Sequence, residues 1–140
     1  MVANSVTFEG GCLCENVRYR ISVEPIDAGY CHCRICQRSS GAPVLAWISV
    51  PVNEFSYLKE APAVYASSPK AVREFCGQCG TQILFRKHGA DEVDINLATL
   101  DDPEVIQPRI HTWTDSRISW FDTADDLKRY PDGGPGPSAS

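Results

Sequence analysis

The sequence predicts an all-β domain with few short helices, and three observations support this class. Residues 17–23 alternate apolar and polar side chains without a break, which is typical of a half-buried strand. Residues 44–50 are more continuously apolar and end at Pro51, as expected of a buried strand. Further short apolar segments are separated by glycine and proline, which favours a sandwich or barrel-like arrangement.

The other predicted elements follow in chain order. Strands are expected at residues 71–75, 81–86, 93–97 and 109–113. Helix signals are weak: a turn or two after Cys33, and a second segment at 122–130 that Asp122 or Thr123 could cap. We expect a single domain over residues 1–130. Residues 131–140 are rich in proline, glycine and serine and are expected to form a flexible tail.

Charge and composition restrict the partners and the compartment. The formal net charge is -5, and ionised thiols with bound metal make it more negative. This balance argues against binding to nucleic acid or to an anionic membrane surface, and no apolar run is long enough to span a bilayer. The first seven residues lack the basic and apolar regions of a signal peptide. Together with the expected free thiols, this predicts a cytoplasmic protein. No feature of the sequence specifies an oligomeric state.

All seven cysteines fall in three tight clusters, at residues 12–14, 31–36 and 76–79. An odd number of cysteines at such short spacings suits metal thiolates better than disulfides. The pairs Cys12/Cys14 and Cys76/Cys79 can together form a closed four-thiolate zinc site. Closing the long loop between the pairs costs roughly 4 kcal/mol, whereas structural zinc contributes on the order of 10–16 kcal/mol. This site is therefore predicted to stabilise the fold; buried cysteines without metal are the alternative.

The remaining trio, Cys31, Cys33 and Cys36, predicts a second zinc site that is one protein ligand short. Three protein ligands with one open position are typical of catalytic zinc. A zinc ion with three thiolates is soft and electron-rich, so it suits holding a substrate thiolate better than activating water. Cationic neighbours are expected near such an anionic site, and Arg34 and Arg38 are the candidates for substrate contacts.

Several alternatives remain for the trio. His111 is the best candidate to complete a closed three-cysteine, one-histidine site; His88 is another, and His32 should point away because it lies between two ligands. An iron–sulfur cluster would need a fourth ligand. If both sites are closed, the protein is a zinc-stabilised protein-binding module without catalysis, and a zinc-ribbon reader of nucleic acid is a third possibility.

Four segments resemble the motifs of the glutathione-dependent formaldehyde-activating enzyme family, whose domain also occurs in centromere protein V. They are residues 10–14, residues 31–36 with 40–42, residues 75–81, and residues 100–103 with 108–111. The resemblance extends in order over residues 7–121. Two positions depart from the family pattern: Glu15 replaces a usual glycine, and Gln37 replaces a common arginine.

The resemblance implies a β-tent fold of packed antiparallel sheets around two zinc ions. It implies that Cys12, Cys14, Cys76 and Cys79 hold a structural zinc. Cys31, Cys33 and Cys36 would hold the catalytic zinc, where glutathione is the implied thiol. The implied reaction joins glutathione and formaldehyde into S-hydroxymethylglutathione, so the protein would be a carbon–sulfur lyase in the reverse sense.

Overall fold

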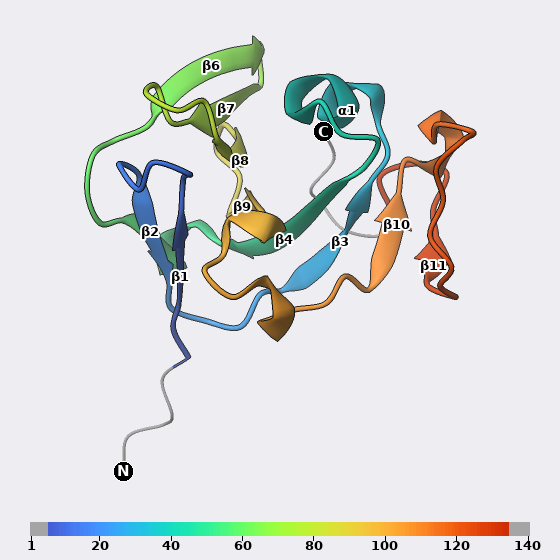
Figure 1. Cartoon of the computed structure of the whole chain (residues 1–140), viewed down its shortest axis with the longest axis horizontal. Helices are drawn as coiled ribbons and strands as arrows, with labels where there is room; N and C mark the ends of the chain where they lie inside the picture. The colour runs from blue at the N-terminus through green and yellow to red at the C-terminus, as the bar shows by residue number, and fades with distance from the viewer. Residues whose placement is uncertain (1–5, 135–140) are drawn as a thin grey trace.

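The computed structural model describes residues 6–134 and folds them mainly into two β-sheets (Figure 1). The smaller sheet has the strand order β1-β2-β5, and the larger has the order β11-β10-β3-β4-β9-β8-β7-β6. The strands are β1 Phe8–Gly11, β2 Arg18–Ile21, β3 Asp27–Cys31, β4 Leu45–Pro51, β5 Phe55–Tyr57, β6 Ala63–Ser68, β7 Ala71–Phe75, β8 Gln82–Lys87, β9 Glu92–Asn96, β10 Ile110–Thr112 and β11 Lys128–Arg129.

Strand pairing is antiparallel except at one edge of the larger sheet, where β10 pairs in parallel with both β3 and β11. The helix α1, Arg34–Ser40, lies between the two ends of the larger sheet in the view of Figure 1. Four short 3-10 turns complete the described structure: η1 Val52–Glu54, η2 Leu97–Thr99, η3 Pro103–Val105 and η4 Thr114–Ser116.

The main hydrophobic core includes side chains from both sheets. Tyr19 and Ile21 on β2 are fully buried, while Arg20 between them is exposed. The larger sheet contributes a set of fully buried aliphatic side chains: Ile48, Val50, Ile83, Val93 and Ile95. Burying one such side chain contributes about 1.5–3 kcal/mol to the free energy of folding. The hydrophobic core between the two sheets therefore stabilises the fold independently of any metal.

The predicted all-β class is confirmed, and every strand expected from the sequence is present within a few residues of its predicted bounds. The segment 71–75 coincides with β7. The helix expected after Cys33 is α1. Cys33 caps its N-terminus, and Gly41 ends it with φ 71°, a left-handed conformation that suits glycine. Strands β1, β3, β5, β6 and β11 had no counterpart in the sequence prediction.

The helix predicted at residues 122–130 is wrong. Asp122 Oδ1 accepts a hydrogen bond from the Thr123 amide at 2.8 Å, and Asp125 Oδ1 accepts one from the Leu127 amide at 3.0 Å. Such local side-chain acceptors compete with helical hydrogen bonds for the backbone amides. The segment runs irregularly instead and ends in β11, which adds to the edge of the larger sheet.

The predicted tail begins close to this edge. The Asp132 carbonyl accepts a hydrogen bond from the Trp113 amide at 2.8 Å, so the start of the tail contacts the sheet end. Residues 135–140 lie outside the described residues. No helix in the described part of the chain is both long and apolar enough to cross a membrane.

Candidate metal sites

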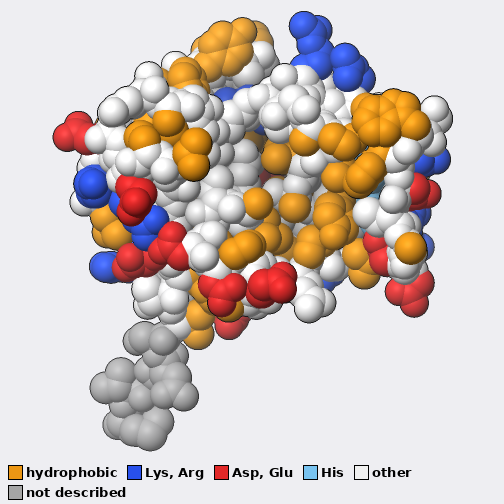
Figure 2. All heavy atoms as spheres, in the orientation of Figure 1, with side chains coloured by type: hydrophobic (Ala, Val, Ile, Leu, Met, Phe, Trp, Pro, Cys, Tyr) orange, Lys and Arg blue, Asp and Glu red, His pale blue; other side chains and the backbone are white. Residues whose placement is uncertain are grey.

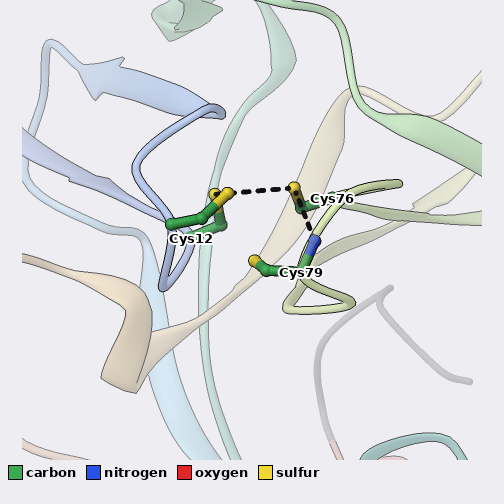
Figure 3. Close-up of side chains that lie close together, drawn as sticks. Cys12, Cys76 and Cys79 are labelled. Carbon is green, nitrogen blue, oxygen red and sulfur yellow. Dashed lines mark hydrogen bonds between the residues drawn. The ribbon is translucent and has the colours of Figure 1, made fainter.

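The first cysteine cluster joins the N-terminal loop to the turn between β7 and β8. Cys12 and Cys14 follow β1, and Cys76 and Cys79 follow β7. Figure 3 shows the Cys12 side chain directed toward Cys76 and Cys79. All four Sγ atoms lie within 4.8 Å of one another, with Cys12–Cys14 at 3.6 Å and Cys14–Cys76 at 3.7 Å. Tetrahedral zinc with bonds of about 2.3 Å requires sulfur separations of about 3.8 Å, so these residues fit the ion.

Hydrogen bonds to sulfur lower the pKa of two thiols of this cluster, Cys12 and Cys79. The Val17 amide donates to Cys12 Sγ at 3.2 Å, and the Cys79 amide donates to Cys76 Sγ at 3.4 Å. The Thr81 hydroxyl lies 3.3 Å from Cys79 Sγ, and hydrogen bonding to Thr81 lowers the pKa of Cys79 to about 5. Thiolates rather than thiols are metal ligands, so these contacts favour the metal-binding form.

The second cluster forms where β3 meets α1. Cys31 ends β3, Cys33 is the N-cap residue of α1, and Cys36 lies in the first turn of the helix. All three are buried, and their Sγ atoms lie within 4.8 Å of one another. The Cys36 amide donates to Cys33 Sγ at 3.2 Å, so the helix cap also orients a candidate ligand.

Close packing of the thiols opposes the ionisation of Cys31 and Cys36 in the absence of a cation. The hydrogen bond with Cys33 raises the pKa of Cys31 to about 11. Contacts with Cys31 and then Cys33 raise the pKa of Cys36 far above its ordinary value. A divalent cation reverses this balance because it stabilises all three thiolates together. The trio therefore has the donor chemistry of a soft metal site.

Among the described residues, no histidine, cysteine or carboxylate joins the trio as a fourth ligand. His111 is held elsewhere: its Nδ1 lies 2.8 Å from His32 Nε2, its Nε2 lies 3.1 Å from Asp125, and its ring stacks on Tyr30. The structure therefore does not support a three-cysteine, one-histidine site. His32 is buried beside the trio, and burial lowers its pKa to about 4.

A small cavity and a wider groove lie on this side of the molecule and share one lining residue. A cavity of about 30 Å³ lies against Cys31 and Cys36 and is walled by Trp47 and Trp113. A wider groove of about 620 Å³ runs beside α1 and β6–β8, and its lining includes Arg38 and Tyr65. Arg73 lines both spaces. Figure 2 shows hydrophobic side chains gathered over this hollowed face, with Lys and Arg side chains above α1.

The profile of the family described as glutathione-dependent formaldehyde-activating enzyme matches residues 7–116. The chain belongs to this family. The match contains all seven cysteines and confirms the resemblance inferred from their spacing.

Two relatives extend the comparison. An uncharacterized lyase of Schizosaccharomyces pombe is 33% identical over 78 residues, which cover 56% of this chain and 56% of the relative. The alignment thus spans about half the length of that curated protein. A crystal structure of a Rhodobacter sphaeroides protein has a TM-score of 0.56 at 23% identity, covering 72% of this chain and 92% of the other. At this sequence identity, the similarity shows a shared fold and nothing further.

The two departures from the usual family pattern have clear structural settings. Glu15 adopts φ 64°, the left-handed conformation that glycine accepts without strain. Gln37 is buried, and its Nε2 donates to the carbonyls of His32 at 2.8 Å and Ser116 at 3.2 Å. Gln37 thereby ties α1 to the segment after β10, a role that the sequence did not reveal.

The structure separates the two arginines predicted to contact substrate. Arg34 is exposed and donates to Gln37 Oε1 at 2.9 Å, and it is not among the residues that line the groove. Arg38 is exposed and does line the groove. Sequence reasoning missed Arg73, because a single arginine on a predicted strand carries no distinguishing signal.

Proposed function

We propose that this chain is a zinc enzyme that binds a small thiol, glutathione or a close analogue, and adds it to or releases it from a small carbonyl such as formaldehyde. In the forward direction the thiol sulfur bonds to the carbonyl carbon. The carbonyl π-electron pair moves to oxygen, which takes up the proton that the thiol loses. The reverse reaction is a carbon–sulfur lyase reaction.

The observation that carries the proposal is the difference between the two cysteine clusters. One cluster supplies four thiols, enough to close a tetrahedral site, whereas the other supplies three. The open cluster is the one whose cysteines, Cys31 and Cys36, line a cavity. A zinc ion held by Cys31, Cys33 and Cys36 would supply a soft centre that favours a thiolate as its next ligand.

Side chains around the trio suit a bound thiol. Trp47 is buried and Trp113 packs beside the cysteines, so together they restrict water at the reacting sulfur. Arg38 in the groove, and Arg34 near it on α1, are proposed to attract an anionic substrate. The four-cysteine site is proposed to hold a structural zinc. Seven free thiols support a reducing compartment, and we propose the cytoplasm.

Exchange of formaldehyde between its hydrate and its glutathione adduct, followed by NMR, tests the reaction. The zinc-loaded protein should accelerate this exchange at least tenfold over the uncatalysed rate. Cys36→Ser, which removes one candidate ligand of the open site, should abolish the acceleration.

Equal exchange with and without protein would contradict the carbonyl reaction. If glutathione also fails to bind, the protein is better described as a non-catalytic, zinc-stabilised protein-binding module.

A further inference from the structure

Arg73 is a buried arginine whose charge has no carboxylate partner within residues 6–134. Its exposed fraction is 7%, and its Nε has no hydrogen-bond acceptor in this part of the chain. The guanidinium lies over the Phe85 ring, 4.8 Å from its centroid, in a cation–π contact. A buried charge is costly unless an opposite charge pairs with it. The unsatisfied donor therefore points to an anionic group from outside the described chain.

The position of Arg73 relates this anion to the open cysteine site. Its side chain lines the small cavity together with Cys31 and Cys36, and it also lines the wider groove together with Arg38. Arg73 is therefore the residue shared by the groove and the cavity at the cysteines, where it would contact a ligand that occupies both.

Asp94 is the acidic residue that lines the small cavity together with Arg73, and no ion pair joins the two side chains in the described structure. Arg73 on β7 lies opposite Phe85 on β8, and Phe85 lies opposite Asp94 on β9, so all three share one sheet face. Two strand spacings, roughly 10 Å, separate the backbones of Arg73 and Asp94. The Asp94 carboxylate instead accepts a hydrogen bond from the Ser49 hydroxyl at 2.5 Å.

We propose that Arg73 binds a carboxylate of the thiol substrate and so restricts the open cysteine site to acidic thiols. This inference rests on the proposed function. A guanidinium binds a carboxylate through paired hydrogen bonds, which would satisfy the buried Nε. A neutral thiol leaves that donor unpaired, and sites with unpaired buried donors discriminate strongly against such ligands.

Calorimetric titration of the zinc-loaded protein with glutathione and with glutathione diethyl ester tests this inference. Both probes carry the same thiol, but only glutathione has carboxylates. We expect wild-type protein to bind glutathione at least tenfold more tightly than the ester. Arg73→Gln should remove most of this preference and leave the affinity for the ester unchanged, whereas Arg73→Lys should keep part of it. Arg20→Gln, which removes an exposed arginine from the smaller sheet, is the control and should behave as wild type.

Three results would overturn the inference. Equal wild-type affinities for the two probes would exclude a carboxylate contact. Equal weakening of both probes by Arg73→Gln would mean that Arg73 acts on the thiolate site rather than on the substrate. Failure of both probes to bind would refute the proposed function itself. If Arg73→Gln loses zinc or unfolds, the wild-type comparison and Arg73→Lys still decide the question.

Discussion

Replacing one cysteine in each cluster should have very unequal effects on stability. Cys76→Ser removes a candidate ligand from the four-cysteine cluster, which brings Cys14 and Cys76 together from 62 positions apart in the chain. Closing such a loop costs roughly 4 kcal/mol, which metal coordination offsets in the folded protein. Since domains are stable by only about 5–15 kcal/mol, losing this site should lower the melting temperature by more than about 10 °C.

Cys33→Ser should act only locally. The trio spans residues 31–36, so a metal bound there would close no long loop. Serine also retains the N-cap acceptor for the Cys36 amide, which lies 3.2 Å from Cys33 Sγ in the native protein. We therefore expect a loss of about 1 kcal/mol or less, and a melting temperature within about 4 °C of wild type.

Thermal melts followed by circular dichroism, combined with zinc content by native mass spectrometry, measure both variants. Wild type should carry two zinc ions per chain, and Cys33→Ser should retain one and remain folded. Equal destabilisation by the two substitutions would refute the division into a structural site and an open site.

Three further outcomes follow from local geometry. Titration with a chelator should remove metal from the three-cysteine site before the four-cysteine site, because fewer ligands hold it; simultaneous loss, read by native mass spectrometry, would contradict this. Glu15→Gly should stabilise the fold by about 0.5–1 kcal/mol by relieving a left-handed backbone, whereas Glu15→Ala should not; urea unfolding measures both. Gly11→Ala should lower the free energy of unfolding by about 1–3 kcal/mol, because the added Cβ would overlap the Val17 carbonyl oxygen. Gly77→Ala is the control and should be nearly neutral in the same urea assay, because its Cβ would make an ordinary 3.5 Å contact. A neutral Gly11→Ala would show that the end of β1 adjusts freely.

The strands that could be predicted are those in which the pattern of apolar and polar residues matches the pattern of buried and exposed side chains. In β2, buried Tyr19 and Ile21 flank exposed Arg20, so alternation in the sequence reflects the two faces of the sheet. The two cysteine clusters could also be predicted from the sequence. Cysteines a few residues apart bring their sulfur atoms close together in most folds.

Other elements depend on contacts between distant segments. Strand β3, Asp27–Cys31, includes Gly29, where a Cβ would press on Trp47 and Ile110 from the neighbouring strands. Its pairing with β4 and β10 therefore defines it, rather than any apolar pattern of its own. The edge strand β6 leaves Val64 and Tyr65 exposed, so it carries no burial signal.

The surroundings of the open site could not be predicted for the same reason. Arg73, Trp47 and Trp113 come from three separate strands or strand ends and meet only after the sheet curves around the trio. Similarly, His111 was considered as a metal ligand because the sequence does not reveal which residues contact a single histidine on a strand. In the fold its ring nitrogens face His32 and Asp125.

X-ray absorption at the zinc edge, with and without glutathione, tests the central claim most directly. With four cysteines at one site and three at the other, protein sulfur alone gives an average of about 3.5 sulfur neighbours per zinc. Glutathione should raise this average to about 4 in wild type and leave it unchanged in Cys33→Ser. An average that does not change on adding glutathione, in protein carrying two zinc ions, would contradict an open thiol-binding site.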